Sequence, residues 1–158
     1  MRQLLGALRP ESPDRMLRPQ PTITDISALV ENAAKVGTHA TVTSFTNGPP
    51  LSPIIQLTVY RIVQEALSNA VRHAPFADTR VVIATEPTHV TVSIENDAPE
   101  AAPSQDRSRP EIGGQGLRGM RERVALLDGN VTQTKSHGGG FLVTATIPIR
   151  ADESQDRT

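Results

Sequence analysis

The sequence contains no cysteine and few aromatic residues, and both shortages narrow what the chain can be. Without cysteine there is no disulfide, no thiolate metal site and no cysteine nucleophile, which fits a reducing compartment. Aromatic residues make up 3% of the 158 residues, so valine, isoleucine, leucine and alanine must fill the core. With 37% hydrophobic residues, a chain of this length can bury one core and is expected to form one domain.

The chain also lacks a charge imbalance and a long apolar run. Sixteen Lys and Arg residues against 17 Asp and Glu residues give a net charge of −1, which disfavours nucleic-acid binding driven by a basic field. No apolar run approaches the roughly 18–20 residues of a membrane span. Residues 1–10 are too short and too interrupted for a signal peptide. We therefore expect a cytoplasmic segment that contacts neither nucleic acid nor membrane.

The spacing of apolar residues predicts an alternation of helices and strands. Helices are expected over 24–35, 51–73 and 117–127, and strands over 39–46, 80–85, 89–95, 130–135 and 141–149. The rest is expected to be a helix end (1–9), a linker (10–22), a mobile loop (98–116) and a polar tail (151–158). Two hairpins make the sheet mixed and mostly antiparallel. Helices on one face of such a sheet give a two-layer α/β sandwich.

The long predicted helix has two unlike faces. Its apolar stripe, at spacings of three and four, consists of Tyr60, Val63, Leu67, Val71 and Ala74. The opposite face carries Glu65, Asn69, Arg72 and His73. Carboxylate and amide oxygens suit Mg²⁺, and arginine pairs with phosphate, so this face suits a metal–polyphosphate. A solvated helix face is the alternative, although an asparagine in mid-helix favours a bound ligand.

A polar pair closes the strand predicted at 89–95. Asn96 or Asp97 would hydrogen-bond the edge of a base lodged against Ile62 and Ala66, and an ordinary turn is the alternative. Thr144 and Thr146, on the last strand, are interpreted as strand residues, one of which, Thr146, is expected to face the nucleotide.

Glycines open the helix predicted at 117–127. The run Gly113-Gly114-Gln115-Gly116-Leu117 combines free backbone N–H groups with the positive end of a helix dipole, which favours an anion. Most glycine runs are linkers, so this signal is weak by itself. The run at 138–140 is interpreted as a hairpin turn only.

Taken together, these motifs resemble a known family. A helix with E-x-x-x-N, a strand ending in N-D, a loop and a glycine-led helix occur in the order of the GHKL (Bergerat) ATP-binding fold. The strings QEALSNAVRHA and GQGLRGMRERVALLDG resemble the DesK/NarL-partner branch of bacterial sensor histidine kinases, common in actinobacteria. The resemblance implies the end of a dimerisation helix and a linker at 1–22, an ATP-binding catalytic domain at 23–150 and a disordered tail at 151–158.

The resemblance implies roles for individual residues. Asn69 matches the Mg²⁺-binding asparagine, and Glu65 matches the acid that polarises the attacking group or helps to hold the metal. Arg72 and His73 match positions near the phosphates and the nucleoside. Three residues match the second glycine box, which meets the phosphates: Gly114, Gly116 and Leu117.

The chain departs from the family at the adenine-reading aspartate of DxGxG. Here the motif reads Asn96-Asp97-Ala98-Pro99-Glu100, so a neutral amide replaces the acid and both glycines are missing. An asparagine oxygen still accepts a hydrogen bond from the adenine amino group, but the bond is weaker. Asp97 serves instead if the register shifts by one.

The resemblance finally implies an activity, with ATP and Mg²⁺ as cofactors. The γ-phosphoryl group would pass to a histidine on a separate dimerisation segment, within the same parent chain or on a split partner, and then to a response regulator. None of the four histidines here has the setting of that acceptor. The parent protein is expected to be a homodimer and can be membrane-anchored. A degenerate, non-catalytic module and an anti-sigma-type serine kinase are the alternatives.

Overall fold

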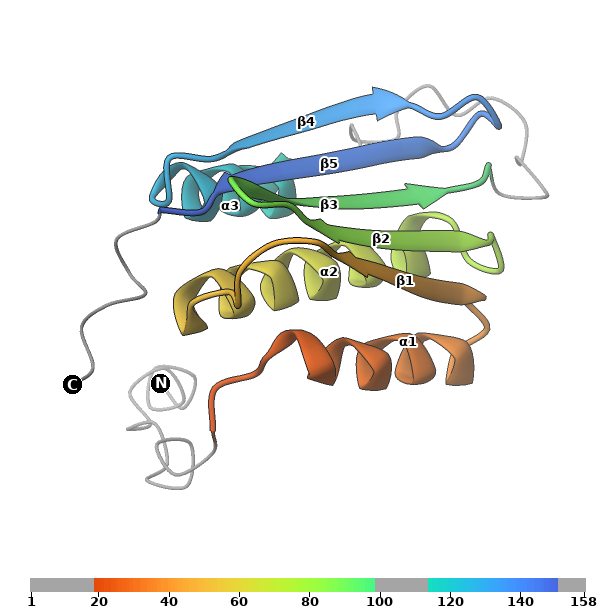
Figure 1. The fold of residues 1–158 in the computed structure, drawn as a ribbon. Coiled ribbons are helices and arrows are strands. Elements are labelled where there is room, and N and C mark those ends of the chain that lie inside the picture. The colour runs from red at the N-terminus through yellow and green to blue at the C-terminus, as the bar shows by residue number, and fades with distance from the viewer. Residues whose placement is uncertain (1–18, 99–113, 151–158) are drawn as a thin grey trace, which may run out of the picture.

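A five-stranded sheet lies over a layer of three α-helices (Figure 1). The computed structural model describes residues 19–98 and 114–150. The helix end expected at 1–9, most of the linker, most of the loop and the polar tail lie outside the described residues. The elements, in chain order, are the short 3-10 helix η2 (Ile23–Asp25), α1 (Ile26–Lys35), β1 (Ala40–Thr46), α2 (Pro53–His73), β2 (Thr79–Thr85), β3 (His89–Asn96), α3 (Gly114–Ala125), β4 (Asn130–Lys135) and β5 (Phe141–Pro148).

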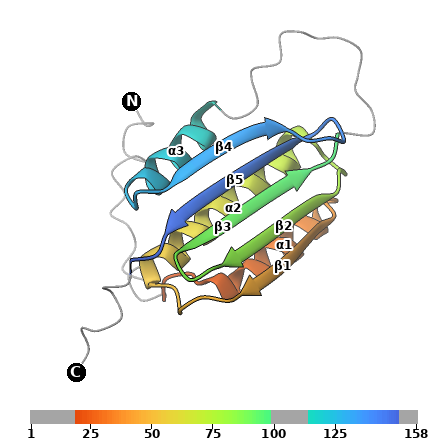
Figure 2. The same ribbon diagram turned by 45° about the horizontal axis from the view of Figure 1, so that its top comes forward.

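The sheet is mixed, as the sequence predicts. Its strand order is β1-β2-β3-β5-β4; β1 and β2 run parallel, and every other neighbouring pair is antiparallel. Figure 2, turned to look onto the sheet, shows all three helices behind the same face. The predicted two-layer α/β sandwich is therefore confirmed, and the sheet has a helix-covered face and an open face.

Alternating burial along the strands follows from these two faces. In β3, for example, Val90, Val92, Ile94 and Asn96 are buried on the helix-covered face, and the residues between them are half-buried on the open face. Successive side chains of a strand point to opposite faces of the sheet. The alternation therefore shows, for each strand residue, whether its side chain lies on the helix-covered face or on the open face.

Helix α2 packs its buried side on the centre of the sheet, but its apolar stripe is rotated from the one expected. Val59, Ile62 and Val63 have no exposed surface, and Ala66 is 2% exposed, whereas Tyr60 and Val71 are only half-buried. The expectation that a base lodges against Ile62 and Ala66 is wrong in this respect, because both side chains belong to the hydrophobic core. Helix α2 contacts the sheet, α1 and α3. The buried part of its surface is therefore wider than a single row of residues spaced three and four apart.

Two helix boundaries show how local sequence and tertiary contacts compete. Helix α1 ends as predicted, since Gly37 adopts a φ of 92°, a left-handed conformation that glycine accepts without strain. Helix α3 begins at Gly114, three residues before the predicted start. Glycine is a poor helix former, so the sequence of residues 114–116 predicts a loop. Of these residues, Gly116 packs against Glu65 of α2, a contact that supports the first turn of α3.

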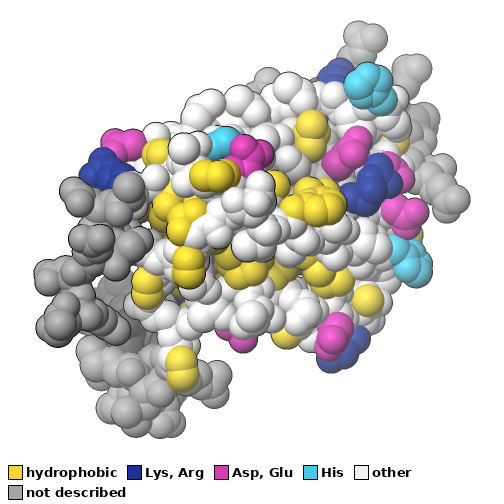
Figure 3. All heavy atoms as spheres, viewed as in Figure 1, with side chains coloured by type: hydrophobic (Ala, Val, Ile, Leu, Met, Phe, Trp, Pro, Cys, Tyr) yellow, Lys and Arg dark blue, Asp and Glu magenta, His cyan; other side chains and the backbone are white. Residues whose placement is uncertain are grey.

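No helix in the described ranges is long and apolar enough to cross a membrane. The surface mixes polar and apolar side chains, and Figure 3 shows charged side chains of both signs next to one another at more than one place. At the start of β2 and the end of β3, an arginine lies beside two carboxylates.

Candidate functional site

The predicted carboxylate, Glu65, lies against the first turn of α3. A β-carbon added to Gly116 would stand 2.1 Å from Glu65 Oε1, so glycine at this position lets the carboxylate pack directly on the helix backbone. Glu65 is half-buried and makes no hydrogen bond or ion pair with any other described residue. The structure therefore brings together two motifs that are 51 residues apart in the sequence.

Asn69 lies one helical turn beyond Glu65, on the same side of α2. It is 7% exposed, and its amide has no hydrogen bond within the described part of the chain. The amide of Asn69 is thus mostly enclosed, and it is free to accept or donate a hydrogen bond to a ligand. Side-chain oxygens at positions i and i+4 of one helix are of the type that Mg²⁺ prefers, and this ion commonly takes its other ligands from phosphate and water.

The two basic residues of this face are less enclosed. Arg72 is exposed, and its guanidinium donates a hydrogen bond of 3.4 Å to Ser68 Oγ in the preceding turn. His73 is the last residue of α2 and is half-buried. Both lie at the C-terminal end of the helix, toward the end of the sheet where β3 finishes.

The first turn of α3 supplies backbone donors beside Glu65. The first four N–H groups of a helix have no partner within it, and in α3, whose described residues begin at Gly114, they include those of Gly114 and Gly116. The helix has 12 residues, so its dipole adds to the attraction for an anion. Leu117 is 7% exposed and anchors this turn in the core. The structure thus places the predicted glycine box next to the predicted acid.

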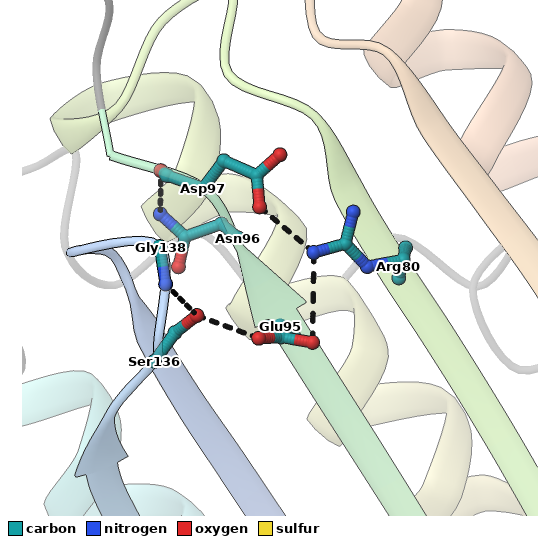
Figure 4. Close-up of polar contacts among 6 residues, drawn as sticks. All are labelled: Arg80, Glu95, Asn96, Asp97, Ser136 and Gly138. Atoms are coloured by element: carbon teal, nitrogen blue, oxygen red, sulfur yellow. Dashed lines mark hydrogen bonds and ion pairs between the residues drawn. The ribbon is translucent and has the colours of Figure 1, made fainter.

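Asn96 points to the helix-covered face, and its oxygen is unsatisfied. The residue is 2% exposed, and Oδ1 is a buried acceptor with no hydrogen bond in the described structure. The amide nitrogen, by contrast, donates to the backbone oxygen of Asp97 at 3.3 Å (Figure 4). An acceptor that is buried, oriented and unpaired suits a ligand that offers an N–H group.

Asp97 has a different environment. It follows β3 and its carboxylate accepts a hydrogen bond of 2.7 Å from Arg80, which also lies 3.5 Å from Glu95. Asn96 and Asp97 therefore face opposite sides of the sheet, and Asn96 is the one on the side of α2 and α3. The pKa of Arg80 is raised, chiefly by the hydrogen bond to Asp97, so this cation keeps its charge at any working pH.

Thr146 is not brought to the site. It pairs with Thr91 of β3 and Asn130 of β4, whereas Asn96 pairs with Phe141 at the opposite end of β5. Its neighbours Ala145 and Ile147 are buried on the helix-covered face, so Thr146 lies on the open face. The prediction that Thr146 faces the nucleotide is thus wrong, because strand alternation turns it away.

The sequence reasoning missed several residues around Asn96. Thr79 pairs directly with Asn96, is 1% exposed, and has a hydroxyl without a partner. Gly140 packs on the other side: a β-carbon there would lie 1.8 Å from the backbone oxygen of Asn96. The turn at 138–140 is a hairpin turn between β4 and β5, as predicted, and Gly140 packs on the backbone of Asn96. Only the strand register, which sequence periodicity does not provide, reveals these contacts.

Comparison with known proteins identifies the family and the fold. Residues 54–151 match the family of histidine kinase-, DNA gyrase B- and HSP90-like ATPases. The chain belongs to this family. It is 35% identical over 94 residues to the sensor histidine kinase ComP of Bacillus subtilis (strain 168), which covers 60% of the chain and 12% of ComP. It is 31% identical over 99 residues to the histidine-protein kinase/phosphatase DegS of Brevibacillus brevis, covering 63% of the chain and 25% of DegS.

Solved structures show the same fold. The blue-light activated histidine kinase of Erythrobacter litoralis EL346 superposes with a TM-score of 0.58 at 22% identity, covering 79% of this chain and 42% of that one. The catalytic domain of the histidine kinase ThkA gives a TM-score of 0.57 at 15% identity, covering 80% of this chain and 90% of that one. At these identities the likeness concerns the fold, which is that of a histidine kinase catalytic domain.

Membership in this family makes the chain a histidine kinase-type ATPase domain, with ATP as the implied ligand. The chain spans only about an eighth to a quarter of the length of the curated relatives that it matches. The signal, the acceptor and the partners of the whole protein therefore require their own argument.

Proposed function

We propose that this domain binds Mg²⁺–ATP and donates the γ-phosphoryl group to a histidine on a separate dimerisation segment, for relay to a response regulator. The observation that carries the proposal is the contact of Glu65 with Gly116, which sets a carboxylate beside the open N–H groups of α3. Asn69 completes an oxygen-bearing edge one turn away. A triphosphate with its cation is the ligand whose charges complement both groups.

Glu65 and Asn69 would hold the magnesium ion, which neutralises charge on the phosphates when bound. No group of three or more His, Asp or Glu side chains in the described ranges is arranged to hold a metal ion. Two oxygen-bearing side chains fit an ion that takes its other ligands from phosphate and water, which is usual for Mg²⁺ at nucleotide sites.

The residues of this domain would bind the nucleotide, orient its phosphates and polarise the attacking group. The α3 N–H groups and Arg72 would hold the phosphates in line, and His73 would lie near the nucleoside. Glu65 would polarise the attacking imidazole of the acceptor, so that a P–N bond forms as the bond to the β-phosphate breaks and ADP leaves. Most of the rate enhancement would come from positioning and charge stabilisation.

The partners follow from the same proposal. The acceptor histidine would belong to a dimerisation domain of the same parent chain or of a split partner, and the parent protein would be a homodimer. The curated relatives are named sensor histidine kinases, and such kinases pass the phosphoryl group to a regulator. A cytoplasmic site of action fits these partners.

One observation favours a second candidate function. Asn96 replaces the charged adenine-reading residue of the family by a neutral amide, which weakens the hydrogen bond to the base. A domain that has lost nucleotide affinity would serve as a non-catalytic assembly module. An anti-sigma-type serine kinase is the remaining alternative, against which the helix GLRGMRERV argues.

Calorimetry with Mg²⁺ and a non-hydrolysable ATP analogue separates these functions. We expect saturable binding that requires the cation and is lost in Asn69→Ala. Absence of binding at millimolar nucleotide would favour the assembly module. Phosphoamino-acid analysis of the full-length parent protein incubated with its partners then distinguishes phosphohistidine from phosphoserine.

A further inference from the structure

Arg80 braces the end of β3 from the open face of the sheet. It lies in β2, and its guanidinium contacts the carboxylates of both Asp97, at 2.7 Å, and Glu95, at 3.5 Å (Figure 4). Glu95 in turn accepts a hydrogen bond of 2.6 Å from Ser136 Oγ in the turn between β4 and β5. Arg80 and Glu95 together thus link β2, the end of β3 and the β4–β5 turn.

The contacts of Arg80 on the open face are linked to Asn96 on the helix-covered face through the backbone of Asp97. The backbone oxygen of Asp97 accepts the hydrogen bond from Asn96 Nδ2 at 3.3 Å. That bond leaves Asn96 Oδ1, rather than the nitrogen, as the free group of the amide. The position of Asp97, which Arg80 holds by its side chain, therefore decides which end of the amide is presented.

The orientation of an amide has chemical consequences that the orientation of a carboxylate lacks. The two ends of the asparagine side chain differ, since one accepts and the other donates. Adenine carries an amino donor at position 6, where guanine carries an oxygen acceptor. An amide with its oxygen forward favours adenine, and a flipped amide favours guanine.

The charges explain why Arg80 is needed. Glu95 and Asp97 are two residues apart, and both carboxylates are within 4 Å of the same guanidinium. Without the cation, two like charges would remain side by side on one face and would repel each other. The backbone N–H of Asp97 donates a hydrogen bond of 2.9 Å to the backbone oxygen of Asp78, so Arg80 is the second of two ties on this residue. Loss of Arg80 would free the carboxylate and loosen the peptide group that follows Asp97.

We propose that Arg80 is a positioning residue that fixes the Asn96 amide for adenine and so sets the base selectivity of the nucleotide site. This inference rests on the proposed function, because it assumes that a nucleotide base meets Asn96. It assigns a role on the open face of the sheet to a residue that does not touch the nucleotide.

The test compares Arg80→Met, Arg80→Lys and the control Arg150→Met. Arg150 also forms an exposed ion pair, with Asp128, but at the other end of the sheet. Dissociation constants for non-hydrolysable ATP and GTP analogues with Mg²⁺ are measured by calorimetry, together with thermal unfolding. A purely structural role for Arg80 would change stability but would leave the ratio of the two constants unchanged.

We expect Arg80→Met to weaken binding of the ATP analogue by about three- to tenfold, as for loss of one oriented hydrogen bond. The preference of Arg80→Met for ATP over GTP should be lower than that of the unsubstituted domain. Arg80→Lys should recover part of this preference, and Arg150→Met should have the same preference as the unsubstituted domain. Suppose that the unsubstituted domain binds the ATP analogue and Asn96→Ala does not. An unchanged preference for ATP over GTP in Arg80→Met would then overturn the role of Arg80 but leave the proposed function standing. If the unsubstituted domain itself does not bind the ATP analogue, both the proposed function and this inference fail.

Discussion

Replacing Gly116 by alanine separates the chemistry of the site from its stability. The new β-carbon would stand 2.1 Å from Glu65 Oε1 and 3.0 Å from its carboxyl carbon, so the oxygen must retreat by about 1.3 Å to reach an ordinary 3.4 Å contact. Glu65 ends in a flexible side chain and is half-buried, so it can move without disturbing the backbone. Alanine also favours helix over glycine by up to about 1 kcal/mol.

The expected outcome is therefore a stable but impaired domain. A displacement of about 1 Å at a reacting group can cost on the order of 100-fold in rate, and we expect a 10- to 100-fold loss of phosphoryl transfer. The free energy of unfolding should stay equal or rise slightly. Binding of the Mg²⁺–nucleotide should weaken less than transfer, because the N–H groups of α3 remain in place.

Phosphoryl transfer from labelled ATP in the full-length parent protein provides the activity, and chemical denaturation of the domain provides the stability. Gly119→Ala is the matched control: it lies in the same helix, and its nearest neighbour for a β-carbon is Arg123 Nη2 at 3.9 Å. The control should gain the same helix propensity and keep full transfer. If Gly116→Ala transfers phosphoryl groups as fast as Gly119→Ala, the contact with Glu65 has no role in the chemistry.

Three further substitutions test other parts of the site. Asn69→Ala should lower affinity for a Mg²⁺–nucleotide by at least about tenfold in calorimetry with little change in stability, since the amide has no bond in the described structure; unchanged affinity would refute its role. Thr79→Val removes a buried, unpaired hydroxyl and should raise the free energy of unfolding by about 1–2 kcal/mol in urea; a loss of stability would show a missed partner. Gly140→Ala meets backbone oxygen at 1.8 Å and should cost about 2–4 kcal/mol, measured likewise; a neutral effect would mean that β5 moves freely.

Periodicity predicts most of the fold because each element has a simple pattern. The strands alternate, and the helices α1 and α2 repeat at three and four residues, so their ends fall within a few residues of the predicted positions. The start of α3 is not predicted from the sequence because Gly114 and Gly116 have low helix propensity, whereas in the structure Gly116 packs against Glu65 of α2. Local propensity carries no information about that contact.

The candidate site is predictable in its motifs but not in its geometry. Glu65, Asn69 and Gly116 carry recognisable spacing, and the structure brings Glu65 and Gly116 into contact. Arg80 and Thr79 carry no motif, and their relation to Asn96 depends on the β2–β3 register. Register is fixed by pairing between strands, which no single segment encodes.

The neutral amide at Asn96 also fits its burial. At 2% exposure, a carboxylate there would lose nearly all of its hydration, and a buried charge without a partner is far more costly than a buried amide. The domain without nucleotide therefore loses less stability with asparagine than with aspartate. The amide, however, can be presented in two ways, whereas the two oxygens of a carboxylate are equivalent. A site that exchanges aspartate for asparagine gains stability but then needs a device to orient the amide, and the bond from Asn96 to the Asp97 backbone, held by Arg80, is such a device.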